Sequence, residues 1–421
     1  MEAINPVLVG FTGCLIAAFL LSELFNTLRY PRVLGYILTG IIFNIPPVRS
    51  FMLHPEFNPL LEFLSEVGVV FFLLLAGAEI DLSRLKKTTL PSISVGVLSF
   101  LIPMIIGLCT LSALGYDPTV SFILSLCLSV TAATIAVEVL MEYEILDADD
   151  GSIIVAAGMI DDLLGILALT LILALIQTGG QVSSSLIGVF SVLSLEYVTF
   201  FIIAYILGFK VLPQLAGLIR HGNSSNVMFT LSIIFGLTIT LLSQVFGLSS
   251  LIGAFIAGLI INITVKNKPE GEGILKGLDM LTFGLIIPFF FISIGLKFDL
   301  NGIMSDIPLL VGLIFIALTG KYLGVFIAGK ITGLNQSSIN VIGLSMNNRG
   351  GIELVIALVA VSYNLITESL FSIVIAVSFI TTFISLVYFN KQIQYNSQKF
   401  GLLVDGVLKK GEAHARLRDI K

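Results

Sequence analysis

GMIDDLLG, residues 158–165, places two adjacent aspartates inside an apolar segment that runs from residue 153 to residue 176. At about 1.5 Å per residue, a helix of this length crosses a bilayer, and both carboxylates would lie near its middle. An acid at that depth costs roughly 2.5 to 3.5 kcal/mol on insertion scales. Such acids usually mark ion or proton pathways, so ion handling is the first hypothesis and a structural polar pair is the alternative.

The composition is that of a membrane protein. Of the 421 residues, 56% are hydrophobic and 12% are charged, and the charged share of soluble proteins is about twice as large. The first apolar run, residues 6–25, has neither a basic segment before it nor a small-residue cleavage site, so we expect a retained helix. The three cysteines lie singly in apolar runs and predict neither a disulfide framework nor a metal site.

Apolar runs separated by polar or Gly/Pro-containing breaks predict an all-α polytopic protein with thirteen transmembrane helices. The predicted spans are residues 6–25, 33–45, 60–80, 90–114, 120–140, 153–176, 186–212, 227–245, 251–265, 275–296, 307–331, 339–361 and 365–389. Eighteen of the 22 Lys and Arg residues lie in the connections that follow odd-numbered spans or in the adjoining ends of the spans, and short cytoplasmic loops are enriched in these residues. We therefore expect a multi-pass protein of the cell membrane with its N-terminus outside and its C-terminus in the cytoplasm.

The chain also matches itself at an offset of 218 residues. Residues 34–45 (LGYILTGIIFNI) fall on residues 252–263 (IGAFIAGLIINI), and residues 71–82 fall on residues 289–300, with nine identities noted in the two windows. The offset takes the second span to the ninth, and an odd number of crossings reverses direction. The sequence therefore predicts an inverted-topology repeat, which is the architecture of many secondary transporters.

Two spans contain polar interruptions at matching places of this repeat. Residues 129–134 read SVTAAT, and the same offset places them on the NNRGG stretch of residues 347–351. Transporters with inverted repeats bind ions at such breaks, where unwound carbonyls suit a cation and half-helix ends carry partial charges. Two kinked packing helices are the alternative, since Ser, Thr and Gly are common where membrane helices touch.

A lysine lies in the middle of the eleventh span, in the sequence ALTGKYLGVFIAG of residues 317–329. This residue, Lys321, is too far from either end to reach the interface, so its ammonium needs an anionic partner, and Asp161 or Asp162 is the natural candidate. If a cation displaces Lys321 from the aspartate, the lysine can release its proton, which links cation binding to proton release. A static salt bridge is the alternative.

Other polar residues flank the two interruptions. Arg349 and Glu353 lie four residues apart, where an ion pair could form on one helix face, and we favour a structural role in which they compensate the half-helix ends. Thr134 belongs to the first interruption. Glu138, four residues later, is expected near the inner end of that span, where it would line a cytoplasmic funnel.

Together these residues resemble a known family, the monovalent cation/proton antiporters of the second type, and within it the sodium/proton exchangers with two adjacent aspartates. The resemblance covers nearly all thirteen spans. It is carried by LGYILTG (34–40), EVGVVFFLLLAGAEIDL (66–82), SVTAATIAVEVL (129–140), GMIDDLLGI (158–166), LIGAFIAGLI (251–260), PFFFISIGLKFDL (288–300), GKYLGV (320–325) and NNRGGIELVIAL (347–358).

The resemblance implies roles for single residues. Asp162 would be the principal carrier of cation and proton, Asp161 would pair with Lys321, and Thr131 with neighbouring carbonyls would complete the shell of a transported Na⁺. Members with two aspartates resemble electrogenic exchangers, which trade more than one proton per cation. The implied function is exchange of Na⁺ or Li⁺ for H⁺ by alternating access, in the service of pH homeostasis.

The resemblance also implies an organisation of the chain as a homodimer in the lipid bilayer. Two scaffold and dimerisation segments, two core segments, a linker helix and a short cytoplasmic tail are expected. They are residues 6–80 and 227–296 (scaffold), 90–176 and 307–389 (core, with the two interrupted, crossing helices), 186–212 (linker) and 390–421 (tail).

Other functions would also use acids inside a membrane. A K⁺/H⁺ antiporter or a K⁺ efflux protein is the alternative transport function. An intramembrane aspartyl protease would need its two aspartates on different helices, whereas Asp161 and Asp162 project about 100° apart on one helix. No phosphate-binding Gly loop, Cys/His metal spacing or nucleophile motif is present in the sequence, so we expect a transporter, without catalytic residues, cofactor or nucleic-acid partner.

Overall fold

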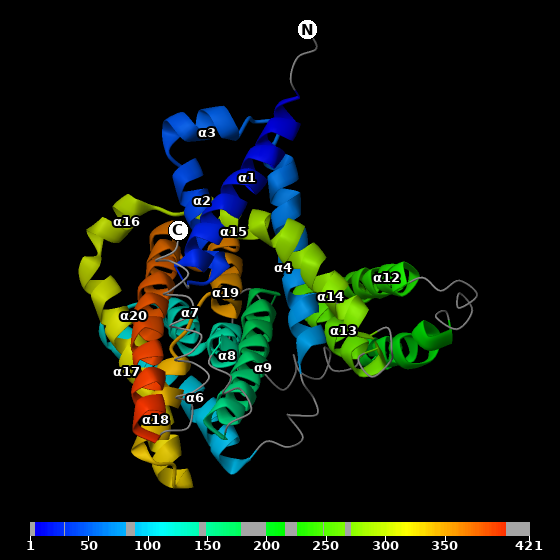
Figure 1. The fold of residues 1–421 in the computed structure, drawn as a ribbon. Helices are drawn as coiled ribbons and strands as arrows, with labels where there is room; N and C mark the ends of the chain where they lie inside the picture. Colours follow the sequence, from blue (N-terminus) through cyan, green and yellow to red (C-terminus); the bar gives the residue numbers. More distant parts are fainter. Residues whose placement is uncertain are drawn as a thin grey trace, which may run out of the picture. The chain divides into compact units, whose positions relative to one another are not determined.

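In the computed structural model, residues 5–28, 30–80, 89–142, 149–177, 199–214, 225–246, 248–265 and 271–400 are described, and they form helices joined by short turns and breaks (Figure 1). Eight helices in these ranges are long and apolar enough to cross a membrane. They are Pro6–Thr27, Asn58–Glu79, Leu90–Ala113, Asp149–Leu169, Val227–Val245, Gly273–Leu296, Ile307–Thr332 and Glu368–Ile393. The prediction of an all-helical polytopic membrane protein is confirmed.

Five shorter apolar helices accompany the long ones. They are Arg32–Phe43, Pro118–Ser129, Thr199–Gln214, Ser250–Thr264 and Ile352–Ser362. The predicted span of residues 186–212 lies partly outside the described residues, which begin again at residue 199, and the predicted tail of residues 390–421 is described only to residue 400.

Helix boundaries follow local capping chemistry. α1 (Pro6–Thr27) begins after Asn5, whose side chain accepts hydrogen bonds from the N–H groups of Val7 and Leu8, and proline occupies its first turn. α17 (Ile307–Thr332) begins after Asp306, whose carboxylate accepts the N–H of Leu309, and it ends at Gly333 in the left-handed conformation. These caps supply hydrogen-bond partners for end groups that the helices themselves leave unpaired.

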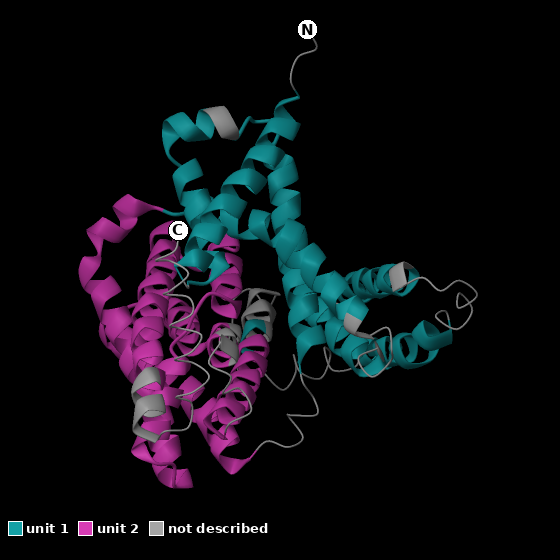
Figure 2. Cartoon of the chain, in the orientation of Figure 1, with its two compact units in different colours: residues 1–82, 168–298 teal, residues 83–167, 299–421 magenta. Residues whose placement is uncertain are grey.

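The chain divides into two compact units, each made of two separate stretches (Figure 2). Unit 1 comprises residues 1–82 and 168–298, and unit 2 comprises residues 83–167 and 299–421. The helices of unit 1 are α1, α2 (Arg32–Phe43), α3 (Pro46–Met52), α4 (Asn58–Glu79), the π-helical turn η1 (Leu207–Val211), α12 (Ser225–Val245), α13 (Ser250–Val265), α14 (Gly271–Leu281), the π-helical turn η2 (Thr282–Ile286) and α15 (Ile287–Leu296).

Unit 1 is held together by helices that approach each other at glycines. A side chain at Gly40 in α2 would meet the Cα of Gly295 in α15 at 2.8 Å, and a side chain at Gly77 in α4 would meet the N of Leu259 in α13 at 2.9 Å. In the second pair, Gly258 of α13 packs directly on the carbonyl oxygen of Leu74 in α4. Small residues allow this close contact between membrane helices, where packing and not the hydrophobic effect drives association.

Gly258→Ala is therefore expected to destabilise unit 1, because the new methyl group would overlap the Leu74 carbonyl and force α4 and α13 apart. Overpacking of this kind typically costs about 1 to 3 kcal/mol. The control is Gly312→Ala in α17, where no atom lies within 4 Å of the new Cβ. Thermal melting in detergent should give a lowered midpoint for the first variant and an unchanged one for the control; equal midpoints would contradict the packing.

Two asparagines tie helix ends together in the same unit. The Asn44 amide, after α2, donates to the carbonyl oxygen of Phe298 at 3.0 Å. The Asn262 amide, in α13, donates to the carbonyl oxygens of Ala78 and Ile80 at 2.5 Å each. Each bond satisfies a carbonyl at or just after a helix end that would otherwise have no donor.

Unit 2 contains the two interrupted helices. Its helices are α6 (Leu90–Ala113), α7 (Pro118–Ser129), α8 (Ala133–Glu142), the first part of α9 (Asp149–Gln177), α16 (Leu300–Ser305), α17, α18 (Gln336–Ser345), α19 (Ile352–Ser362) and α20 (Glu368–Phe400). α6 packs along α17, where a side chain at Gly320 would meet Pro103 at 2.8 Å. This close packing presents Lys321, the next residue of α17, to the interior of the unit, where it is fully buried.

Candidate ion-binding site

The first predicted interruption is present. α7 ends at Ser129 and the helix resumes at Ala133, with Val130, Thr131 and Ala132 outside helical conformation. All three residues of the break are buried. The break leaves the carbonyls at the end of α7 and the N–H groups at the start of α8 in need of partners inside the protein.

The second predicted interruption is present as well. α18 ends at Ser345 and α19 begins at Ile352. Gly350 in this break has a φ of 134°, a conformation that side-chain-bearing residues rarely adopt. The N–H of Ala132 donates to the carbonyl oxygen of Asn348 at 2.7 Å, so the two breaks lie side by side.

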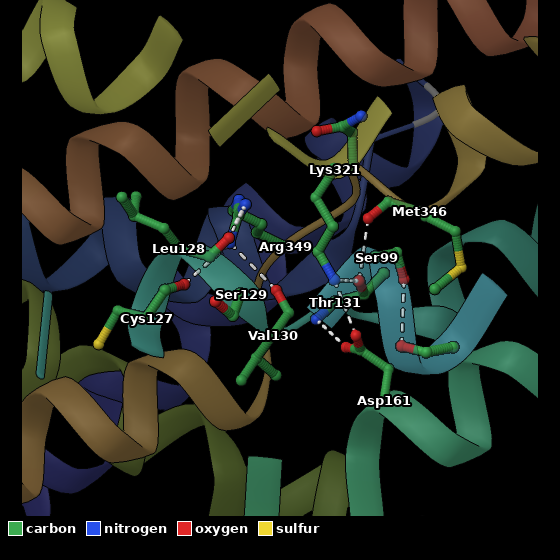
Figure 3. Close-up of polar contacts among 12 residues, drawn as sticks. Ser99, Cys127, Leu128, Ser129, Val130, Thr131, Asp161, Lys321, Met346 and Arg349 are labelled. Carbon is green, nitrogen blue, oxygen red and sulfur yellow. Dashed lines mark hydrogen bonds and ion pairs between the residues drawn. The ribbon is translucent and has the colours of Figure 1, made fainter. Parts of the chain in front are cut away.

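Lys321, Asp161 and Thr131 form a closed cluster where the breaks meet (Figure 3). The Lys321 ammonium donates to Asp161 Oδ1 at 2.8 Å and to Thr131 Oγ1 at 2.5 Å. The second carboxylate oxygen, Asp161 Oδ2, accepts the backbone N–H of Thr131 at 2.6 Å. Because all three residues are 0–1% exposed, the ion pair and its hydrogen bonds offset a desolvation cost of several kcal/mol per charge.

The structure therefore shows which of the two adjacent aspartates is the partner of Lys321. Asp161 forms the ion pair, as the family resemblance implied. Asp162 accepts no hydrogen bond and forms no ion pair with any residue that the structure describes, and its side chain is partly accessible. One aspartate is thus neutralised by the Lys321 ammonium, and both carboxylate oxygens of its neighbour are unpaired among the described residues.

Arg349 compensates the end of α7. Its guanidinium donates to the carbonyl oxygens of Cys127 (2.8 Å), Val130 (3.0 Å) and Leu128 (2.5 Å), as the dashed lines in Figure 3 show. A positive charge at the C-terminal end of a helix also opposes the helix dipole. Arg349 is 1% exposed, so these carbonyls have no access to water and depend on this side chain.

Glu353 compensates the start of α19. Its carboxylate accepts the N–H of Gly351 at 3.0 Å and also that of Gly350. The favoured role of Arg349 and Glu353, compensation of half-helix ends, agrees with these contacts, and each side chain serves a different helix end. The ion pair that their spacing would allow on one helix face is not formed between these two residues. The spacing of four residues brings side chains together only on a continuous helix, and Arg349 precedes the start of α19.

Sequence reasoning missed two kinds of contact in the second break. Thr382 of α20 exchanges hydrogen bonds with the backbone of Arg349, accepting its N–H at 2.8 Å and donating to its carbonyl at 2.9 Å. The amide groups of Asn347 and Asn348 donate to α18 carbonyls, and their buried amide oxygens receive no hydrogen bond from a described protein group. The Thr381-Thr382 pair in an apolar run was the available signal for the first contact.

Two predicted site residues lie outside the described side chains. The backbone of α8 includes Thr134 and Glu138, but the positions of their side chains are not described. Among the side chains that are described, no group of three or more His, Cys, Asp or Glu residues could hold a metal ion.

The site combines features that suit an exchanged monovalent cation. It holds two adjacent carboxylates, of which one is paired and the other has no partner among the described residues, together with polar backbone from two helix breaks and the Lys321 ammonium. A carboxylate at membrane depth tends to hold either a proton or a cation, because a bare negative charge is costly there.

Comparisons with known proteins point to one family of membrane proteins. The family model for transmembrane sodium/hydrogen exchangers matches residues 14–390. A Na⁺/H⁺ antiporter of Enterococcus hirae is 30% identical over 385 residues, which is 91% of this chain and 97% of the relative. The Na⁺/H⁺-K⁺ antiporter GerN of Bacillus cereus is 27% identical over 371 residues, covering 88% of this chain and 92% of that protein.

The fold is also similar to a solved structure. The sodium proton antiporter MjNhaP1 of Methanocaldococcus jannaschii superposes with a TM-score of 0.69 at 18% sequence identity, over 95% of this chain and 99% of the other. From the family match over most of its length, this chain belongs to the transmembrane sodium/hydrogen exchanger family.

Proposed function

We propose that this protein exchanges Na⁺ or Li⁺ for H⁺ across the cell membrane by alternating access, and that the exchange is electrogenic. The observation that supports the proposal is the buried Lys321–Asp161 ion pair, at the meeting point of two helix breaks and next to Asp162, whose carboxylate has no partner among the described residues. Membership of the exchanger family supports it.

In this proposal Asp162 carries the cation or the proton. Asp161 and Thr131 contribute further oxygens to the transported cation once Lys321 has moved away from them. A single site that holds either ion explains exchange, because the empty charged site would be costly to move through the apolar barrier. Lys321 supplies a second proton when the cation displaces it from Asp161, so more than one proton is traded per cation.

Arg349 and Glu353 keep the breaks intact during this cycle. Each side chain binds a half-helix end whose partial charge is opposite to its own. Such compensation is required wherever unwound backbone lies at membrane depth. Glu138, and Thr134 at the start of α8, are assigned to the cytoplasmic funnel and to the first break from their sequence positions.

We further propose thirteen membrane crossings arranged as an inverted repeat. The repeat is supported by the two asparagine contacts of unit 1, because the offset of 218 residues takes Asn44 to Asn262 and Ile80 to Phe298. Each asparagine thus binds the carbonyl that is equivalent to the partner of the other. The N-terminus is placed outside and the C-terminus in the cytoplasm by the distribution of Lys and Arg.

Unit 1 is proposed as the scaffold that forms a homodimer and unit 2 as the moving core. The support is that the division of the chain largely follows the predicted segments, with residues 1–82 and 227–298 in one unit and residues 90–167 and 307–389 in the other. Residues 168–176, which belong to the predicted core segment 90–176, fall in unit 1 instead.

Purified protein in proteoliposomes tests the exchange. A pH gradient is imposed, Na⁺, Li⁺ or K⁺ is added in turn, and internal pH and membrane potential are recorded together. We expect Na⁺ and Li⁺ to collapse the gradient and to generate a potential. Proton flux that only K⁺ elicits, or cation flux without any proton movement, would contradict the proposal.

Lys321→Gln is expected to slow exchange and to make it electroneutral, because the glutamine amide still donates to Asp161 but carries no proton to trade. The measured quantity is the potential generated per proton transported. The matched control is Lys330→Gln, near the end of α17, where the lysine lies over the Phe326 ring and outside the cluster. A variant with the wild-type potential per proton would exclude Lys321 as the second proton carrier.

A further inference from the structure

We infer that Thr131 is a positioning residue, which holds the Lys321 ammonium and joins it to the end of α18 as the counterpart of Arg349. The inference deepens the proposed exchange and rests on it for its transport measurement. It assigns to Thr131 a task in the cation-free state that differs from the role of cation ligand.

The hydrogen bonds of Thr131 determine what its hydroxyl group can still bind. Its hydroxyl has one proton, which it donates to the carbonyl oxygen of Met346 at 2.9 Å. The hydroxyl oxygen must therefore face a donor or a cation, and here it accepts from Lys321 at 2.5 Å. The backbone N–H of the same residue binds Asp161. Thr131 thus touches both members of the ion pair and the second break at once (Figure 3).

The contact with Met346 is the repeat equivalent of a contact made by Arg349. The offset of 218 residues takes Thr131 to Arg349 and Leu128 to Met346. Arg349 donates to the carbonyl of Leu128 at 2.5 Å, and Thr131 donates to the carbonyl of Met346. In each break, one side chain therefore donates to a carbonyl at the end of the helix before the other break. Leu128 lies three residues before Thr131, and Met346 lies three residues before Arg349.

The two fastenings differ in where the positive charge comes from. At α7 the charge belongs to Arg349 itself. At α18 it belongs to Lys321 and reaches the Met346 carbonyl through the Thr131 hydroxyl, in a chain from ammonium to hydroxyl to carbonyl. Hydrogen bonds in such a chain polarise one another, so the ammonium strengthens the bond that holds the end of α18.

This arrangement connects the position of the Lys321 ammonium to the second break. When Lys321 moves away from Asp161 and Thr131, the hydroxyl loses its charged donor and the hydrogen bond to Met346 weakens. A cation that used the Thr131 oxygen would have to displace the ammonium from that same atom. Thr131 therefore makes the position of α18 respond to the occupant of the site.

The test compares Thr131→Val, which keeps the shape but removes the hydroxyl, with Thr131→Ser, which keeps it. Thr381→Val is the control, because this buried hydroxyl bonds only to carbonyls of its own helix. Hydrogen–deuterium exchange is measured in peptides covering residues 344–351, and the pH dependence of Na⁺/H⁺ exchange is measured in proteoliposomes.

We expect Thr131→Val to speed deuterium exchange in residues 344–351 about tenfold, which corresponds to about 1.4 kcal/mol. We also expect its activity profile to move to lower pH by roughly one unit, because the ammonium form of Lys321 loses an acceptor and yields to the cation more readily. Thr381→Val should resemble the wild type in both measurements, and Thr131→Ser, which keeps the hydroxyl, should restore slow deuterium exchange in residues 344–351 relative to Thr131→Val.

Unchanged deuterium exchange in Thr131→Val, or an equal effect in Thr381→Val, would overturn the fastening of α18. A second outcome would be an unmoved pH profile together with a raised KM for Na⁺ and an altered preference between Li⁺ and Na⁺. It would show that Thr131 is only a ligand of the cation, and it would overturn the positioning role. Deuterium exchange does not depend on transport, so failure of the proposed function would be recognised separately, by absence of exchange in the wild type.

Discussion

Asp162→Asn is expected to abolish cation-dependent proton flux, with a loss of at least about a hundredfold, while the protein remains folded. Proton transfer by a placed carboxylate and charge neutralisation of the cation both require the ionisable group. Because Asp162 has no hydrogen bond or ion pair with any described residue, replacing one oxygen by an amide breaks no contact of the fold. Flux is measured with a pH-sensitive dye in proteoliposomes.

The neighbouring residue provides the control for this prediction. Asp161→Asn removes the partner of Lys321 and leaves a buried ammonium without its carboxylate, which costs about 3 to 5 kcal/mol in comparable buried pairs. We therefore expect Asp161→Asn to lower the melting temperature and Asp162→Asn to leave it near the wild-type value. Normal exchange by the Asp162→Asn variant would show that Asp162 does not carry the cation or the proton.

Arg349→Met is expected to give the largest loss of stability of any single substitution at the breaks. It leaves the carbonyls of Cys127, Leu128 and Val130 without their donor, and each unsatisfied buried group costs about 1 to 3 kcal/mol. The end of α7 also loses a compensating charge. The expected outcome is a strongly lowered melting temperature or a failure to accumulate folded protein.

Unfolding of this variant can be followed with a thiol-reactive dye, because Cys14 and Cys127 are buried and become reactive when the protein opens. The exposed Cys109 gives a constant background. Arg32→Met is the control, since the Arg32–Glu23 ion pair is well exposed and such pairs contribute about 0 to 1 kcal/mol. A similar small shift in both variants would contradict the proposed role of Arg349.

The helix breaks could be predicted from the sequence because they are departures from an otherwise continuous apolar pattern. Ser129 to Thr134 and Asn347 to Gly351 stand out in this way, and each observed break lies within one residue of the predicted one or inside it. A lysine in mid-span likewise requires an anionic partner, whatever the fold.

The hydrogen bonds within the site could not be predicted, because they depend on backbone conformation inside the breaks. The spacing of Arg349 and Glu353 would allow them to meet on one helix face, yet Gly350 turns the chain between them and each side chain binds a different helix end. The choice of Asp161 over Asp162 as partner of Lys321 depends on how α9 is rotated, which the apolar pattern of a helix buried on several sides does not define.

The most direct test of the account is whether Na⁺ binding releases protons from this site. Isothermal titration calorimetry in two buffers of different ionisation enthalpy gives the number of protons released per Na⁺ bound. If Asp162 and Lys321 both give up protons to the cation, more than one proton is released in the wild type, a smaller number in Lys321→Gln, and Asp162→Asn shows neither binding nor release. Na⁺ binding without proton release, or undiminished release in Asp162→Asn, would contradict the account.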